Sequence, residues 1–131
     1  MGHVDLSRSL AQVGADFTAE PRARRLQKAR VSVVMPTFNE AQNLAATISG
    51  LVGFLGPRCA SYEILVVDDG STDATAREVL GLPQAWSIAL VQLSRNFGKE
   101  AAITAGLEHA GGDLVLCIDA DGQHPLATVE A

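Results

Sequence analysis

Cysteine and long apolar runs are both scarce in this chain of 131 residues, and each scarcity excludes a class of protein. The two cysteines, Cys59 and Cys117, are too few for a disulfide scaffold or a four-ligand zinc site, and they favour a reducing compartment. No apolar run approaches the roughly 18 residues that a membrane-spanning helix needs, and no signal-peptide pattern opens the chain. We therefore expect a location in the cytoplasm or at the cytoplasmic face of a membrane.

Basic residues are scarce in most of the chain. Residues 31–131 contain four Lys and Arg against twelve Asp and Glu, a net charge of −8, whereas residues 1–30 contain six basic and three acidic residues, a net charge of +3. The acidic part argues against a nucleic-acid-binding surface, because phosphate contacts need clustered Lys and Arg. It leaves open a small anionic ligand, since carboxylates can hold a divalent cation and the cation can hold a phosphate.

The first 30 residues lack strand-like runs, and we expect them to form a basic, partly disordered leader. Two interpretations apply to the basic stretch 21–30: a solvated tail, or a segment that lies on anionic lipid headgroups. The tail is favoured, because Leu26 is the only large apolar residue of that stretch. The rest, 31–131, is expected to form one domain, and the apolar content of 47% excludes disorder for the chain as a whole.

From Val31 the chain alternates between short apolar runs and segments with helical spacing. The runs at 31–35, 62–67, 88–93 and 114–118 predict four buried strands, the first closed by Pro36. Helices are expected over 44–55, from a cap at Thr72 or Asp73 to Leu80, and over 98–110. Strands that are apolar throughout and joined by helices predict a mostly parallel sheet covered on both faces, so the expected fold class is α/β and Rossmann-like.

Polar residues follow three of the four predicted strands. Five carboxylates are expected at one edge of the sheet: Glu40, Asp68, Asp69, Asp119 and Asp121. Ligands of such sheets bind at the carboxyl ends of the strands. Like charges so close need compensation, which a metal ion and ligand hydrogen-bond donors would provide. Helix capping is the alternative; we expect it for Asp73, but not for Asp119 and Asp121, because no helix is predicted directly after them.

Two well-known phosphate-binding loops are excluded, and a calcium-binding loop fits the sequence poorly. No G-x-G-x-x-G sequence follows the first strand, which excludes that route to dinucleotide binding. Gly98-Lys99 resembles part of a phosphate-binding P-loop, but Leu93 stands at its first glycine and Glu100 at its Ser or Thr. A calcium loop that begins at Asp119 would need glycine where His124 stands.

Four motifs together resemble a known family. They are VSVVMPTFNE at 31–40, VVDDGSTD at 66–73, LSRNFGKE at 93–100 and DADGQHP at 119–125. In this order, each at a strand end or helix start, they resemble the GT-A glycosyltransferases of family 2 over about residues 31–126. More narrowly, they are similar to the polyprenyl-phosphate group, which includes dolichol-phosphate mannose synthase and bactoprenol glucosyl transferase.

The resemblance implies a metal-dependent inverting glycosyltransferase of cell envelope glycan synthesis. Such an enzyme moves a sugar from a UDP- or GDP-linked donor to a polyprenyl phosphate, either dolichyl or undecaprenyl phosphate. Members of the group continue with acceptor-binding elements and often with membrane-spanning segments. We therefore expect 31–131 to be the nucleotide-sugar-binding part of a truncated GT-A domain, with membrane contact made by the missing segments.

The resemblance also implies roles for single residues. The nucleotide-binding set is Pro36, Phe38, Glu40, Asp68, Asp69 and Asp119, with Phe38 in place of the usual Tyr. The D-x-D pair and a downstream Gln imply Mg²⁺ or Mn²⁺ on Asp119, Asp121 and Gln123, in keeping with the oxygen ligands that these cations prefer. The predicted catalytic set is Asp121, Arg95 and Lys99. Arg95 and Lys99 are included because their positive charge beside the site can steady a phosphate, with a solvated helix start as the alternative.

Two other functions stay open. The chain is a non-catalytic nucleotide-sugar-binding module if the acceptor half is absent from the protein. Alternatively, the enzyme uses a sugar hydroxyl as acceptor, as polysaccharide synthases do. The run of Arg95 to Lys99 favours a lipid phosphate.

Overall fold

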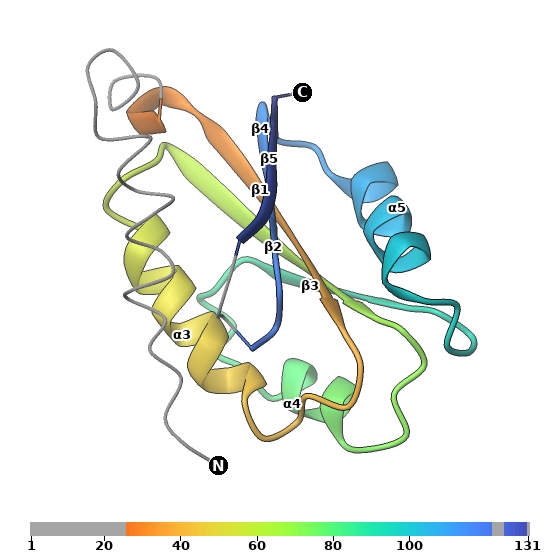
Figure 1. The fold of residues 1–131 in the computed structure, drawn as a ribbon. Coiled ribbons are helices and arrows are strands. Elements are labelled where there is room, and N and C mark those ends of the chain that lie inside the picture. The colour runs from red at the N-terminus through yellow and green to blue at the C-terminus, as the bar shows by residue number, and fades with distance from the viewer. Residues whose placement is uncertain (1–25, 122–124, 131) are drawn as a thin grey trace.

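The computed structural model describes residues 26–121 and 125–130, which form one sheet with helices packed against it. The strands are β1 (Arg30–Thr37), β2 (Ser61–Asp68), β3 (Ile88–Gln92), β4 (Leu114–Ile118) and β5 (Pro125–Glu130). The longer helices are α3 (Leu44–Leu55), α4 (Thr75–Leu80) and α5 (Lys99–His109). Strands and helices alternate along the chain as far as β4 (Figure 1).

The sheet has the strand order β3-β2-β1-β4-β5, and all neighbouring strands are parallel except β4 and β5. The chain adds β2 and β3 on one side of β1 and then crosses to β4 on the other side (Figure 1). This reversal between β1 and β4 is the switch point outside which open α/β sheets bind ligands. The predicted α/β class with mostly parallel strands is confirmed.

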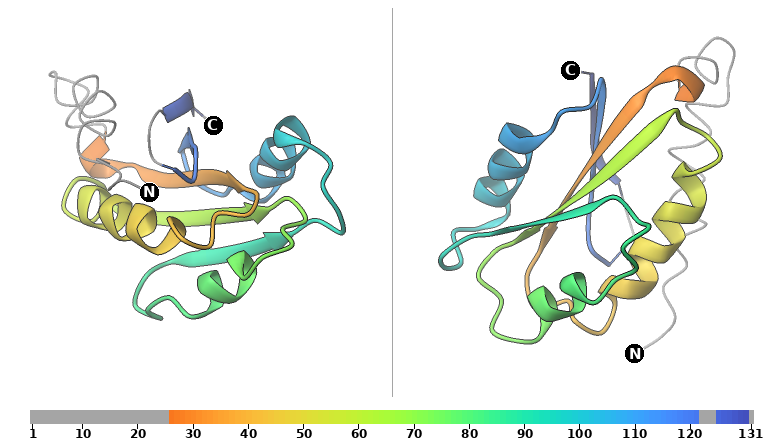
Figure 2. Two further views of the ribbon diagram at one scale, coloured as in Figure 1. Left: turned by 60° about the horizontal axis from the view of Figure 1, so that its bottom comes forward. Right: turned by 180° about the vertical axis from the view of Figure 1, so that it is seen from behind.

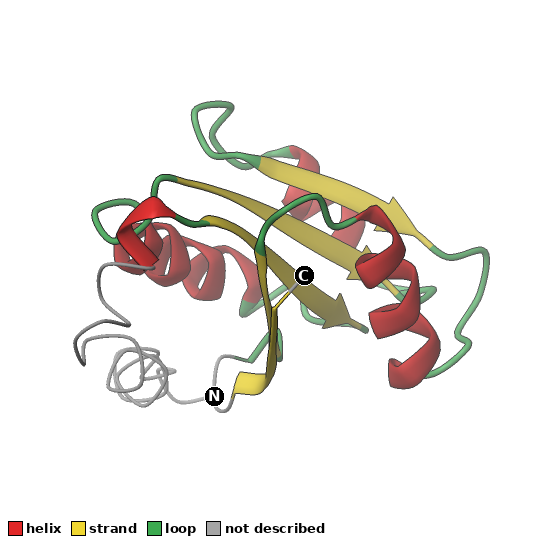
Figure 3. Ribbon diagram, turned by 90° about the horizontal axis from the view of Figure 1, so that it is seen from above, coloured by secondary structure: helices red, strands yellow, loops and turns green. Residues whose placement is uncertain are grey.

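Alternate residues of the central strands face opposite sides of the sheet, so the sheet carries two apolar layers. On one side, Val33 and Met35 pack with the apolar side chains of α3. On the other side, Val34 and Leu65 pack with Ala102 of α5. Figure 2 shows α3 and α5 on opposite sides of the sheet, and Figure 3 shows the strands lying between the helices. The predicted covering of both faces is confirmed, and each large aliphatic side chain buried there contributes about 1.5–3 kcal/mol.

The first strand is longer than its sequence predicts. Pro36 was expected to close it, but β1 continues through Pro36 to Thr37. β1 pairs with β4 only from Val31 to Val34, whereas its pairing with β2 runs to Thr37. The last residues of β1 are therefore at an edge on the β4 side, where a residue without an N–H is tolerated. The carbonyl of Thr37 faces β2, because it accepts the N–H of Asp69 at 2.8 Å.

The helices lie close to their predicted ranges. α3 coincides with 44–55, and α5 is one residue shorter at each end than 98–110. α4 begins at Thr75 and not directly after a cap at Thr72 or Asp73. The N–H groups of Thr72 and Asp73 donate to the Asn39 side chain instead, which keeps both residues in the loop.

β5 is an addition to the predicted elements. It runs antiparallel to β4, with a register shift between Cys117 and Ile118. The sequence of β5 has no continuous apolar run, so the strand depends on its pairing with β4 more than on its own hydrophobicity.

The predicted leader lies mostly outside the described residues. Its last part is described: Leu26 is 5% exposed and belongs to the same apolar layer as α3, and Arg30 already begins β1. Within the described part of the chain, no helix is long and apolar enough to cross a membrane.

Candidate functional site at the carboxyl edge of the sheet

Hydrogen bonds of Asn39 connect the loops that follow β1 and β2. Its Oδ1 accepts the N–H of Thr72 at 2.8 Å and the N–H of Asp73 at 3.2 Å, and its own N–H donates to Ser71 Oγ at 2.9 Å. Asn39 adopts a φ of 55°, in the left-handed region that asparagine tolerates better than most residues. This role of Asn39 is not predicted from the sequence motifs; an asparagine between a strand and a helix was the available signal.

The residues predicted after β1 differ in exposure. Pro36 is buried within β1, whereas the Phe38 side chain is 45% exposed at the edge. Glu40 is half-buried, and its Oε2 accepts a hydrogen bond from Asn43 Nδ2 at 3.2 Å. The ring of Phe38 is therefore accessible at the edge, while Glu40 is held within its own turn.

The two carboxylates at the end of β2 are buried and bonded to backbone N–H groups. Asp68 is 3% exposed, and its Oδ1 accepts the N–H of Ser71 at 3.1 Å. Asp69 is 4% exposed; its Oδ1 accepts the N–H of Phe97 at 2.8 Å and its Oδ2 the N–H of Gly98 at 2.9 Å. Backbone donors thus supply part of the charge compensation that was predicted to come from a metal and a ligand.

Asp73 lies two residues before α4, whose N-cap residue is Ala74, so Asp73 is not the cap that the sequence predicts, although it bonds to the first residue of the helix. Its carboxylate accepts hydrogen bonds from the Thr75 hydroxyl, from the N–H of Thr75 at 2.9 Å and from the N–H of Ala41 at 3.3 Å. The Thr75 hydroxyl is the main cause, and the backbone N–H groups a further one, of a pKa of Asp73 below its ordinary value.

An ion pair joins two predicted site residues that lie far apart in the chain. The Nζ of Lys99, the first residue of α5, lies 3.0 Å from Oδ1 of Asp119, which follows β4. The Lys99 side chain is 56% exposed and that of Asp119 is 25% exposed. Arg95 does not join this pair: its guanidinium lies 5.2 Å from the centroid of the exposed Phe97 ring.

The predicted metal ligands are described only in part. Asp119 and Asp121 lie two positions apart after β4, both half-buried, whereas Gln123 and His124 are outside the described residues. Among residues 26–121 and 125–130, no three His, Cys, Asp or Glu side chains group to hold a metal. The donor chemistry nevertheless fits a hard cation, because Asp119 supplies carboxylate oxygens and already attracts the ammonium of Lys99.

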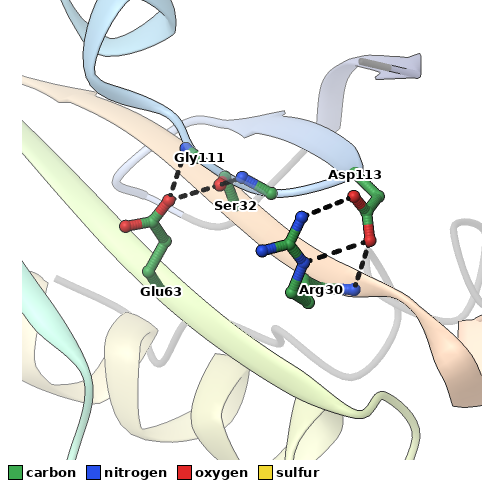
Figure 4. A network of polar contacts seen from close by, with 6 residues as sticks. Arg30, Ser32, Glu63, Gly111 and Asp113 are labelled. Atoms are coloured by element: carbon green, nitrogen blue, oxygen red, sulfur yellow. Dashed lines mark hydrogen bonds and ion pairs between the residues drawn. The ribbon is translucent and has the colours of Figure 1, made fainter.

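A second polar cluster lies at the opposite, amino end of the strands (Figure 4). Oε2 of Glu63 accepts hydrogen bonds from the Ser32 hydroxyl at 2.5 Å and from the N–H of Gly111 at 2.8 Å. Beside it, Arg30 Nη2 pairs with Asp113 Oδ1 at 2.9 Å, and this pairing lowers the pKa of Asp113. The cluster joins β1, β2 and the turn before β4, far from the predicted site residues, and we assign it a structural role.

Comparison with known proteins relates most of the chain to one family. Residues 32–131 match the model of the family described as Glycosyl transferase family 2. The Undecaprenyl-phosphate 4-deoxy-4-formamido-L-arabinose transferase of Sodalis glossinidius (strain morsitans) is 42% identical over 98 residues, which cover 73% of this chain and 30% of that protein. The chain spans about 30% of the length of the curated relatives that it matches.

Solved structures share the fold. The mannosyltransferase PcManGT from Pyrobaculum calidifontis, in complex with GDP-Man and Mn²⁺, superposes with a TM-score of 0.63 at 26% identity, covering 88% of this chain and 39% of that chain. S. aureus TarS 1–349 in complex with UDP-GlcNAc gives a TM-score of 0.62 at 29% identity, covering 70% of this chain and 26% of that chain. The expected GT-A-like fold is therefore confirmed.

Proposed function

This chain belongs to glycosyl transferase family 2, and from that membership we propose that it forms the donor-binding part of a metal-dependent inverting glycosyltransferase. The donor is a sugar linked to UDP or GDP, and the acceptor is a polyprenyl phosphate. The observation that carries the proposal is that three family motifs lie together at one edge, where Asp69 binds the backbone just before α5 and Lys99 pairs with Asp119.

The nucleoside is proposed to lie beside the ends of β1 and β2. The exposed ring of Phe38 can stack on a base, since every base offers an aromatic face. Glu40, Asp68, Asp69 and Pro36 complete the proposed nucleotide site, and all of them except the half-buried Glu40 are buried. UDP-GlcNAc in the TarS structure and GDP-Man in the PcManGT structure support a nucleotide-linked donor.

The diphosphate is proposed to lie between the start of α5 and the turn that follows β4. Lys99 and Arg95 supply positive charge there, and Asp119, Asp121 and Gln123 would hold Mg²⁺ or Mn²⁺. When bound, the cation neutralises charge on the departing nucleoside diphosphate. The Mn²⁺ in the PcManGT structure supports this assignment.

The transfer step is proposed to follow the general pattern of inverting enzymes. The acceptor oxygen attacks the anomeric carbon from the face opposite the diphosphate, and the bond to the diphosphate oxygen breaks as positive charge builds on the sugar. A phosphate acceptor is already ionised, so it needs no strong general base. Asp121, Arg95 and Lys99 are the proposed catalytic residues, and the name of the Sodalis relative supports a polyprenyl-phosphate acceptor.

A product assay with matched acceptors tests the proposal. The protein is incubated with radiolabelled UDP- and GDP-sugars, Mn²⁺ and either undecaprenyl phosphate or a free sugar acceptor. Label in the lipid fraction supports the proposal, and label in the free sugar supports a hydroxyl acceptor instead. Donor binding without any product supports the non-catalytic module. Absence of donor binding contradicts all three.

A further inference from the structure

Asn39 lies between two residues of the proposed nucleotide site, Phe38 and Glu40. We propose that Asn39 is a positioning residue for the nucleoside: its hydrogen bonds to the loop after β2 hold the backbone that carries the Phe38 ring, on which a base stacks. The proposal rests on the proposed function for the identity of the ligand. It leaves in place the nucleotide contact of Asp69 that the family resemblance implies, and it adds a contact that fixes the aromatic ring relative to that carboxylate.

The hydrogen bonds of Asn39 all go to the loop after β2. Its Oδ1 accepts three donors, which are the N–H of Thr72 at 2.8 Å, the Thr72 hydroxyl at 3.3 Å and the N–H of Asp73 at 3.2 Å. Its own N–H donates to Ser71 Oγ at 2.9 Å. One residue of the loop after β1 thus holds three successive residues of the neighbouring loop.

The backbone of Phe38 is therefore held on both sides. Before it, Thr37 is the last residue of β1, and its carbonyl accepts the N–H of Asp69 at 2.8 Å. After it, Asn39 binds the loop after β2. The Phe38 ring itself is 45% exposed. An exposed ring on a fixed backbone loses less conformational freedom when a ligand binds, and this preorganisation favours affinity.

The conformation of Asn39 allows its hydrogen bonds to be tested apart from backbone strain. Its φ of 55° lies in the left-handed region, which glycine adopts without steric cost and which asparagine and aspartate tolerate. Asn39→Gly thus removes the side-chain oxygen and keeps the backbone conformation accessible. Asn39→Asp keeps an oxygen that accepts the same donors. If the hydrogen bonds matter, the first variant should lose the effect and the second should retain it.

Amide exchange tests whether Asn39 holds the loop, and it needs no ligand. Thr72 and Asp73 are exposed and lie outside any helix or strand, and the structure bonds both N–H groups to Asn39. We expect both amides to exchange at least about tenfold more slowly than in an unstructured peptide, and to lose this protection in Asn39→Gly but not in Asn39→Asp. Unprotected amides at both positions of the unmodified protein, or equal protection in Asn39→Gly, would overturn the proposal.

Affinities for nucleotide and for pyrophosphate separate positioning of the nucleoside from general destabilisation. Both are measured with Mn²⁺, and the nucleotide is UDP or GDP, whichever the unmodified protein binds more tightly. Asn39→Gly should weaken nucleotide binding by about tenfold, the effect of one or two lost hydrogen bonds, and Asn39→Asp should restore most of the affinity. Inorganic pyrophosphate has no base, so its affinity should stay unchanged. An equal loss for both ligands, or an unchanged nucleotide affinity in Asn39→Gly, would contradict the assignment.

Ser32→Ala is the matched control for the loss of hydrogen bonds. The Ser32 hydroxyl donates to Glu63 and accepts the N–H of Gly112 at 2.8 Å, at the opposite end of the strands. Its loss removes two hydrogen bonds from the fold without touching the carboxyl edge of the sheet. The variant should keep the nucleotide affinity of the unmodified protein. A tenfold loss in Ser32→Ala as well would make the effect of Asn39→Gly one of stability, against the proposal.

A double variant tests whether Asn39 acts through Phe38. In a Phe38→Ala background, Asn39→Gly should weaken nucleotide binding much less than in the unmodified protein, because the ring that it positions is gone. An equal loss in both backgrounds would overturn the proposal. If the unmodified protein binds neither UDP nor GDP, the proposed function fails, whereas the exchange of the Thr72 and Asp73 amides still decides whether Asn39 holds the loop.

Discussion

At the scale of single residues, the carboxylates of the edge have different partners and so different tasks. Asp68 and Asp69 are buried and bonded to backbone N–H groups, whereas Asp119 is partly exposed and paired with the ammonium of Lys99. Removing a buried acceptor leaves donors unpaired inside the protein, which is costly. Removing one partner of an exposed pair costs about 0–1 kcal/mol. We therefore expect effects on stability and on ligand binding to separate. Loss of Asp68 or Asp69 should lower the free energy of unfolding, whereas loss of an exposed carboxylate should mainly weaken ligand binding.

Asp121→Asn is expected to show that separation. The change removes one carboxylate charge but keeps the side-chain shape, so cation-dependent UDP binding should weaken at least tenfold, the cost of a lost charged contact. The melting temperature should change by only a few degrees. Calorimetric titration with Mn²⁺ and a thermal melt measure the two effects. A variant that unfolds while its UDP affinity is kept would make Asp121 structural.

Asp73→Asn tests a residue that serves the helix start and not the ligand. Its pKa is lowered in the folded protein, so Asp73 contributes stability above its unfolded pKa of about 3.9, and loses it as pH falls through the lower folded value. The variant should melt a few degrees lower at pH 7, and the difference should shrink below about pH 4. Glu78→Gln on the same helix is the control, with a small difference at every pH. A pH-independent difference for Asp73→Asn would contradict the charge argument.

At the scale of elements, α5 lies close to the sheet because its inner face is made of small residues. Ala102 and Gly106 are its buried residues, and a Cβ on Gly106 would lie 2.4 Å from Cγ1 of Val34 and 3.1 Å from Cγ2 of Val67. A glycine inside a helix costs about 1 kcal/mol relative to alanine. Close packing on β1 and β2 offsets that cost and sets the position of Lys99 at the start of the helix.

A pair of glycine variants tests this packing. Gly106→Ala should lower the free energy of unfolding by about 1–3 kcal/mol, because the added methyl meets Val34 in a packed layer. Gly53→Ala in α3 is the matched control, since its added methyl has no atom within 4 Å. It should raise the free energy of unfolding by up to about 1 kcal/mol. Urea unfolding measures both, and equal effects at the two positions would contradict the close approach of α5.

At the scale of the whole molecule, the strand order brings four distant motifs to one edge. Apolar runs and helical spacing were sufficient to predict the strands and helices, and the predicted carboxyl edge followed from parallel pairing. β5 was not predictable, because it depends on β4 for its pairing. The partners of Asp69 were not predictable either, since Phe97 and Gly98 offer backbone groups that no residue type marks. Sequence patterns thus predicted which side chains lie at this edge, while hydrogen bonds that the patterns did not predict accompany the burial of Asp68 and Asp69.

The most direct test of the account is the cation dependence of nucleotide binding. The central claim is that Asp119 and Asp121 meet the diphosphate through Mg²⁺ or Mn²⁺, because without a cation these carboxylates repel it. Calorimetric titration of UDP and GDP into the protein is carried out with Mn²⁺ and again with EDTA. The account predicts that at least one of the two nucleotides binds clearly more tightly with Mn²⁺. Equal affinity in Mn²⁺ and in EDTA would contradict it.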